Sequence, residues 1–175
     1  MKLGYQTITW GGVVGQAQGV TSIKDLFYQT YGSTAKACED IAAAGYTGIE
    51  IFDGNLAEYA NDPDSFKSLL SKHKLELVSV YTGANFIYND ILVDEFHKIK
   101  QAIALAKSMG AINLIVGGGA KRSTGTTEED FQMLAKGLDQ VTDLAAAAGL
   151  TACYHPHLTT IVETTADLDK IMSLS

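Results

Sequence analysis

The sequence has few cysteines and no long apolar run. Among its 175 residues there are two cysteines, Cys38 and Cys153, whose separation fits no metal-binding or redox motif. We therefore expect both to be reduced thiols in the core. No apolar stretch approaches the roughly 20 residues that a membrane-spanning helix needs, and the N-terminus lacks the long apolar core of a signal peptide. These absences predict a soluble, cytoplasmic protein with no membrane partner.

Basic residues are also scarce. Thirteen Lys and Arg face twenty Asp and Glu, which gives a formal net charge of −7. A protein that binds duplex nucleic acid needs a dense positive surface to neutralise phosphates, and here the basic residues are scattered along the chain. We therefore expect a small-molecule partner and no nucleic acid.

Nucleotide-binding signatures are weak or missing. The segment after the first apolar run reads TITWGGVVGQAQG, which contains glycines but no tight turn from a strand into a helix. No phosphate-binding G-x-x-x-x-G-K-[ST] loop is present. A dinucleotide or nucleotide triphosphate is therefore not indicated.

What the sequence does contain is a regular alternation of short strand-like runs and longer helical runs. Strands are predicted at residues 2–9, 47–52, 75–81, 112–118 and 150–155. The predicted helices are a short one from Ser22, one at 33–44, one starting at Asp62–Pro63, one at 92–109, one capped by Thr127 and one from Thr164 or Thr165. The last of these is predicted to have Leu168, Ile171 and Met172 on its apolar side. Strands joined by helical crossovers form a parallel sheet, so the predicted fold class is α/β with a single domain over residues 1–175.

Two architectures fit this pattern: a doubly wound open sheet, and part of a (β/α)₈ barrel. Five strand–helix units in 175 residues average about 35 residues each, and eight such units would approach the size of a typical barrel of ~250 residues. Polar residues also follow the ends of the predicted strands: Trp10, Glu50, Asp53, Tyr81, Asn85, Lys121, Arg122, His155 and His157. Both architectures bind ligands at that edge, so this clustering does not choose between them.

Three segments carry a resemblance to a known family. AGYTGIEIFD, AIALAKSMGAINLIVGGG and YHPHLTTIVETTADLDKIM resemble the second strand, the third helix with the fourth strand, and the fifth strand with its helix in xylose isomerase-like TIM barrels, the sugar phosphate isomerase/epimerase superfamily. The last segment is most similar to the inosose dehydratase branch. Two positions depart from the family pattern: His155 stands where many relatives have a glutamate, and Thr159 stands where a glycine is usual.

The resemblance implies a parallel barrel of TIM type, here a truncated portion of about the first five of eight units. It implies a sugar or polyol isomerase or epimerase that uses a divalent metal (Mn, Co, Mg or Zn) to assist proton abstraction next to a carbonyl. An inosose-type dehydratase, an abasic-site endonuclease of the related fold and a non-catalytic half-barrel remain alternatives. Such a portion alone is expected to be inactive. Its open strand edges favour a homo-oligomer.

Site roles follow from the resemblance and from residue chemistry. His155 is expected to be a metal ligand, because imidazole suits Zn, Mn, Co or Fe. Glu50 and His157 are expected to be catalytic and to bind substrate, and Trp10 and Lys121 are expected to bind substrate. Glu50 lies between two isoleucines, where a carboxylate is rarely left unpaired. Asp53 is expected to lie in a loop.

Overall fold

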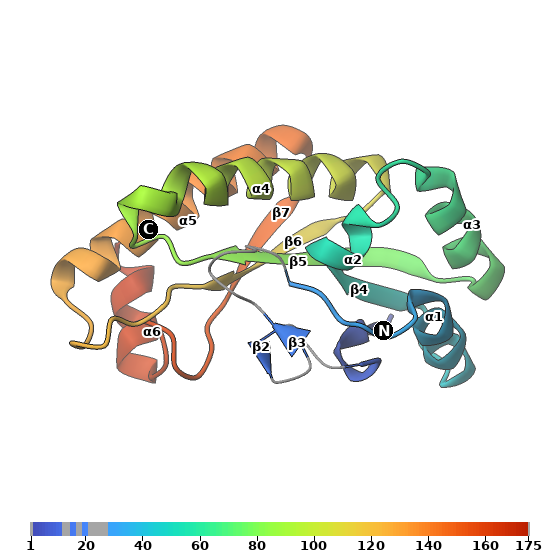
Figure 1. Cartoon of the computed structure of the whole chain (residues 1–175), viewed down its shortest axis with the longest axis horizontal. Coiled ribbons are helices and arrows are strands. Elements are labelled where there is room, and N and C mark those ends of the chain that lie inside the picture. Colours follow the sequence, from blue (N-terminus) through green and yellow to red (C-terminus); the bar gives the residue numbers. More distant parts are fainter. Residues whose placement is uncertain (1, 12–14, 17–18, 21–27, 175) are drawn as a thin grey trace.

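Five parallel strands form the sheet at the centre of the molecule (Figure 1). The computed structural model describes residues 2–11, 15–16, 19–20 and 28–174. The strands lie side by side in the order β1 (Gly4–Gln6), β4 (Gly48–Phe52), β5 (Glu76–Ala84), β6 (Asn113–Gly118) and β7 (Thr151–His155). A doubly wound sheet reverses its strand order part-way, whereas a barrel keeps its strands in chain order. The observed order is that of a barrel wall.

Helices connect the strands and cover one face of the sheet. Figure 1 shows the two longest helices, α4 and α5, running across that face. The helices are α1 (Thr34–Ala43), α2 (Asp53–Ala57), α3 (Pro63–His73), α4 (Asn89–Ser108), α5 (Glu128–Ala148) and α6 (Thr165–Met172). Two short strands, β2 (Gly15–Gln16) and β3 (Gly19–Val20), pair with each other in a separate antiparallel ladder.

The hydrophobic core lies between the sheet and these helices. Its members from the strands include Ile49, Ile51, Val80, Leu114 and Val116, and its members from the helices include Ile41, Phe66, Ile99, Leu134 and Val141. Alternation along a strand sends every second side chain to this outer face. The residues between them therefore point to the opposite face, where the polar side chains collect.

Local signals set most helix boundaries where the sequence predicts them. The Asp62 side chain accepts a hydrogen bond from the Ser65 backbone N–H in front of α3, and a reciprocal capping box joins Thr127 to Asp130 at the start of α5. Gly149 ends α5 with φ of 83°, a left-handed conformation that glycine adopts without a Cβ clash.

Three predicted elements have different bounds, and one of them is β5, which runs to Ala84, three residues past its predicted end. β1 ends at Gln6, and Thr7–Thr9 form a 3₁₀ helix (η1) because the Trp10 N–H turns back to the Thr7 carbonyl at 3.1 Å. The predicted strand over residues 2–9 is therefore too long. α4 starts at Asn89, three residues before the predicted start. The short helix predicted from Ser22 begins outside the described residues.

The apolar side of α6 also differs from the prediction, which grouped Leu168, Ile171 and Met172. Ile171 is 2% exposed, whereas Leu168 is 39% exposed and Met172 is 71% exposed. The Lys170 ammonium lies 4.3 Å from the Phe131 ring centroid on α5. The face directed at α5 thus lies between Lys170 and Ile171, and the helical period turns the other two side chains outward.

Candidate active site

The inner face of the sheet, opposite the helices, carries three rows of side chains. Residues paired across parallel strands point to the same face, and each row is separated from the next by an outward-pointing residue. The first row is Gln6, Glu50, Ser79 and Asn113; the second is Phe52, Tyr81, Ile115 and Cys153; the third is Gly83, Gly117 and His155. The polar residues of this inner face come from all five strands of the sheet.

Glu50 is half-buried in the first row and is paired. Its Oε2 accepts a hydrogen bond from the Ser79 hydroxyl at 2.5 Å. The strand register between β4 and β5 shifts between Ile49 and Glu50, and this irregularity brings Ser79 opposite Glu50. The expectation that this carboxylate has a partner is therefore confirmed, and the partner is a neutral hydroxyl.

His155 ends β7 and is exposed, with its ring between two other rings. Its centroid lies 5.5 Å from that of Tyr81 and 5.8 Å from that of His157. Partial burial of the ring lowers the pKa of His155, and the neighbouring His157 lowers it further, while the Glu50 charge opposes both effects. Cys153 lies on the same face of β7 and Tyr154 on the other, as the strand alternation predicts.

His157 is exposed and has a defined tautomer. Its Nδ1 lies 2.9 Å from the carbonyl oxygen of Leu158. A carbonyl oxygen only accepts hydrogen bonds, so Nδ1 carries the hydrogen in this contact, and in the neutral ring Nε2 carries the lone pair. The His157 carbonyl in turn accepts from the N–H and the hydroxyl of Thr160, at 3.2 and 2.7 Å, which closes the turn around the histidine.

Lys121 lies in the loop after β6, and its ammonium pairs with the Glu163 carboxylate. This pairing lowers the pKa of Glu163. The Ile161 N–H also donates to the Gly119 carbonyl at 2.7 Å. Together these contacts join the loop after β6 to the segment between β7 and α6. The substrate-binding role expected for Lys121 stays a prediction.

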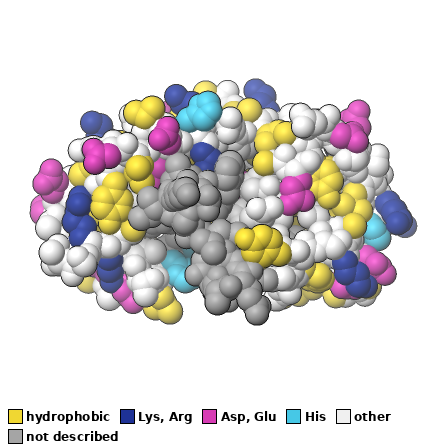
Figure 2. Space-filling view, viewed as in Figure 1, with side chains coloured by type: hydrophobic (Ala, Val, Ile, Leu, Met, Phe, Trp, Pro, Cys, Tyr) yellow, Lys and Arg dark blue, Asp and Glu magenta, His cyan; other side chains and the backbone are white. Residues whose placement is uncertain are grey.

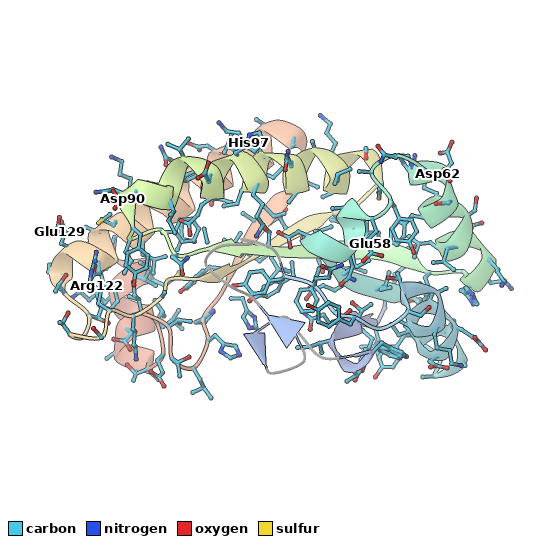
Figure 3. The ribbon with its side chains drawn as sticks, in the orientation of Figure 1. Glu58, Asp62, Asp90, His97, Arg122 and Glu129 are labelled. Atoms are coloured by element: carbon cyan, nitrogen blue, oxygen red, sulfur yellow. The ribbon has the colours of Figure 1, made fainter. Side chains whose placement is uncertain are left out.

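Arg122, the next residue, is turned toward α5 (Figure 3). Its Nε donates to Asp130 at 2.8 Å and its Nη2 to the Ile87 carbonyl at 2.8 Å. The two basic residues of this loop are thus both held by protein groups.

Trp10 is placed against α1. Its indole N–H donates to Asp40 at 3.0 Å, and its ring meets Tyr5 edge to face at a centroid distance of 5.8 Å. Tyr5 is paired with Ile49, an outward-pointing residue of β4. The described contacts of Trp10 thus lie on the α1 side of β1, and its expected role in substrate binding stays a prediction.

Asp53 is a residue whose setting the sequence prediction gave wrongly. It is the first residue of α2, is 3% exposed and forms an ion pair with Lys98 of α4 at 3.0 Å. It also accepts from the Thr82 hydroxyl at 2.7 Å and the Tyr28 N–H at 2.9 Å. Burial raises the pKa of Asp53 and lowers that of Lys98, and the ion pair opposes both shifts. Three hydrogen-bond donors, from Tyr28, Gly54 and Thr82, and the opposite charge of Lys98 hold Asp53, so it belongs to the buried interior and not to a loop.

A sequence signal for this buried charge exists. Lys98 and Glu95 lie three residues apart on α4, at helical spacing from the buried Ala102 and beside the buried Ile99. Charged residues on an apolar helical stripe need a partner. The signal does not say which residue is the partner, because Asp53 is 45 positions away from Lys98 in the sequence.

Known proteins share this architecture. The family described as xylose isomerase-like TIM barrel matches residues 38–174. The chain belongs to this family. The parallel α/β fold of TIM type is thereby confirmed.

Relatives of this xylose isomerase-like chain include the inosose dehydratase of Lacticaseibacillus casei, which is 28% identical over 152 residues. The match covers 80% of this chain and 49% of the relative, so the chain spans about half the length of the curated relatives it matches.

Solved structures similar in fold include the 3-keto-D-glucoside 4-epimerase from E. coli, with a TM-score of 0.66, 16% identity and coverage of 83% of this chain and 61% of that one. The IOLI protein solved with a zinc atom has a TM-score of 0.71, 16% identity and coverage of 99% and 59%. At these identities the likeness concerns the fold alone.

The divalent metal expected for this chain would need several His, Cys, Asp or Glu side chains close together. Across the described part of the chain, no group of three or more His, Cys, Asp or Glu side chains could hold a metal ion. His155 can supply one imidazole, and His157 a second through Nε2. The described residues therefore do not make a metal site by themselves, and His155 as a metal ligand stays a prediction.

The surface of the described part adds two observations. None of the described helices is both long and apolar enough to cross a bilayer. On the face shown in Figure 2, Lys and Arg side chains are interspersed with Asp and Glu and form no continuous basic patch.

Proposed function

We propose that this chain is the N-terminal part of a single-domain (β/α)₈ barrel enzyme that abstracts a proton next to a carbonyl of a sugar or cyclitol. The observation that carries the proposal is the shared inner face: Glu50, His155 and the adjoining His157 come from strands far apart in sequence and face the same space. Ligand sites of barrels lie at the carboxyl ends of the strands, which is where both histidines lie.

The roles follow from the chemistry of these groups. Glu50 can accept a proton from carbon, and Ser79 holds its carboxylate in one orientation. His157 can exchange a proton with a substrate oxygen through Nε2, because its Nδ1 is committed to the Leu158 carbonyl. Removal of the proton next to the carbonyl and its return at the neighbouring carbon gives isomerisation, and its return on the other face gives epimerisation. No step here is assigned to a metal.

Inosose dehydration is the second candidate, supported by the names of the curated relatives. It shares the proton abstraction, after which a hydroxide leaves from the next carbon with a proton and forms water. The two reactions thus differ in whether the substrate loses water.

Incubation of the full-length barrel enzyme in D₂O with inosose, ketoses and aldoses tests the proposal, because the N-terminal part alone is expected to be inactive. Deuterium at the carbon next to the carbonyl, followed by NMR, reports proton abstraction, and a product lighter by one water identifies dehydration. We expect Glu50→Gln and His157→Gln each to slow exchange by about 10²–10⁴-fold, the usual contribution of a general acid or base. His97→Gln is the matched control, since His97 is exposed on α4 and points away from the sheet (Figure 3). Unchanged exchange in Glu50→Gln, or no exchange with any substrate, would overturn the proposal.

We also propose that the chain associates with a second copy of itself. In the described part of the chain, β1 and β7 each have a neighbouring strand on one side only. Exposed strand edges offer unpaired backbone groups that favour association. Sedimentation showing a monodisperse monomer over a wide concentration range would contradict this.

A further inference from the structure

Tyr28 is held in place by an unusually complete set of hydrogen bonds to α2. Its N–H donates to the Asp53 carboxylate at 2.9 Å, and its carbonyl accepts from the Gly54 N–H at 2.9 Å. Two residues on, the Thr30 N–H donates to the Asn55 side-chain oxygen at 2.9 Å, and the Asn55 amide donates back to the Thr30 carbonyl at 2.9 Å. The segment from Tyr28 to Thr30 is thus fixed to Asp53, Gly54 and Asn55.

The Asp53–Lys98 ion pair, whose carboxylate anchors Tyr28, is buried. Asp53 and Lys98 are 3% and 4% exposed, and Lys98 also donates to the Gly83 carbonyl at 3.4 Å. Burying an ion pair removes two charges from water, and the desolvation penalty can exceed the attraction between them. A hydrophobic pair could join α2 to α4 without that penalty. The buried pair does something that a hydrophobic pair cannot, because its carboxylate also binds the backbone of Tyr28.

The ring that this anchor positions lies beside the candidate active site. Tyr28 stacks on Phe52 at a centroid distance of 6.0 Å and meets Tyr81 edge to face at 4.9 Å. Tyr81 in turn packs against His155. Burial raises the pKa of Tyr28 to about 12, so its phenol remains neutral at neutral pH.

Two glycines make room for this arrangement. A Cβ on Gly83 would lie 3.0 Å from Cε2 of Tyr28, and a Cβ on Gly117 would lie 1.9 Å from the Tyr81 hydroxyl. Both glycines belong to the same row of the inner face as His155. The backbone of two strands is therefore kept bare where the two phenols lie.

We propose that Tyr28, held by Asp53 and Gly54 and in edge-to-face contact with Tyr81, is a specificity-determining wall of the site that packs against the carbon skeleton of a cyclic polyol bound between Glu50 and His155. The inference rests on the proposed function and extends it, since the Tyr28 ring would favour cyclic over acyclic substrates. Phe52 and Tyr81 are almost fully buried, whereas Tyr28 is partly buried and is the most exposed of the three rings. An aromatic side chain with a polar tip suits a sugar-like ring, which offers apolar C–H groups between its hydroxyls.

The test compares the binding of a cyclic and an acyclic polyol by titration calorimetry, with myo-inositol and xylitol as probes. We expect Tyr28→Leu to weaken myo-inositol binding by about fivefold to tenfold, the range for loss of a well-packed ring contact, and to change xylitol binding less than twofold. Tyr28→Phe keeps the ring and is expected to retain most of the preference for the cyclic probe. It also covers the case in which Tyr28→Leu fails to fold. Tyr59→Leu is the matched control, because Tyr59 packs against Phe66 on the outer side of the sheet.

The outcomes separate the two proposals. Equal losses for both probes, or wild-type binding in Tyr28→Leu, would overturn the wall while leaving the proton abstraction intact if deuterium exchange persists. A selective loss in Tyr28→Leu together with no exchange in any substrate would support the wall and overturn the proposed chemistry. A wild-type protein that binds myo-inositol no better than xylitol would overturn the wall directly.

Discussion

The Ser79 hydroxyl donates a hydrogen bond to the Glu50 carboxylate at 2.5 Å across two neighbouring strands. The contact depends on an irregular strand register between β4 and β5, without which Glu50 would face a different residue of β5. A short hydrogen bond to a half-buried carboxylate restricts its rotation. This pair therefore sets the direction in which Glu50 meets a ligand.

Ser79→Ala tests this relationship. The carboxylate loses the hydroxyl donor of Ser79, so we expect the deuterium exchange rate to fall by roughly tenfold and the free energy of unfolding to fall by about 1–2 kcal/mol, the usual cost of one such bond. Ser108→Ala is the control, because Ser108 is exposed at the end of α4 and bonds only its own helix. Kinetics and urea denaturation measure both effects. Exchange at the wild-type rate in Ser79→Ala would show that the pair does not orient Glu50.

Asp53→Asn tests the buried anchor. The substitution leaves the Lys98 ammonium buried beside a neutral amide, so we expect the free energy of unfolding to drop by about 3–5 kcal/mol. The control is Lys2→Met, which breaks an ion pair with Glu76 whose side chains are 77% and 56% exposed; such exposed pairs contribute at most about 1 kcal/mol. Urea denaturation of both variants provides the comparison. Equal losses in the two variants would count against the importance of the buried pair.

Gly117→Ala tests the fit of Tyr81. The new methyl would occupy the position of the Tyr81 hydroxyl, so we expect a loss of about 1–3 kcal/mol from overpacking. Gly4→Ala, on the same face of β1, is the control, since its Cβ would meet nothing closer than 3.4 Å. Adding Tyr81→Leu to Gly117→Ala removes the clashing atoms and should make the two losses non-additive. Thermal melts of the single and double variants measure this coupling, and strict additivity would disprove the clash.

Asp167 provides a test that depends on pH. Hydrogen bonds from the Thr164 backbone and hydroxyl hold the pKa of Asp167 below its ordinary value. A carboxylate with a lowered pKa in the folded state contributes stability above its unfolded pKa of about 3.9, and that contribution is lost as pH falls through the folded value.

Asp167→Asn should therefore be less stable than the wild type by a few tenths to about 1 kcal/mol at pH 7. The difference should shrink as the pH falls below the unfolded pKa of about 3.9 and vanish below the lowered pKa of the folded state. Asp169→Asn on the same helix leaves the capping box intact and serves as the control. Urea denaturation from pH 7 to pH 2 measures the difference. A difference that persists unchanged into acid would rule out the ionised cap as its source.

Much of the fold could be predicted because its signals are local. Asp62 before Pro63, and Thr127 three residues before Asp130, start helices where they stand, since a cap needs only its own first turn. The alternation along β7 likewise assigns Cys153 and His155 to one face without knowledge of the neighbouring strand.

Two of the predictions that failed involve contacts between distant segments. The sequence predicts Asp53 in a loop, because its contacts with Lys98, Thr82 and Tyr28 form only in the folded chain. The sequence predicts Leu168 and Met172 on the apolar side of α6, but packing against α5 sets the rotation of α6 and leaves both side chains exposed. No local pattern encodes which surface a helix will meet.

The sequence by itself therefore determined the alternation of strands and helices, the helix ends, the family and the strand end that carries His155 and His157, because each depends on neighbours within a few residues or on a recognisable motif. Only the tertiary structure decided that the strands run in the order of a barrel wall, that Ser79 is the partner of Glu50, and that a buried Asp53–Lys98 pair holds Tyr28 beside the site. Those outcomes depend on strand register and on the packing of α2 and α4. They bring together residues tens of positions apart, whose proximity is a property of the folded chain.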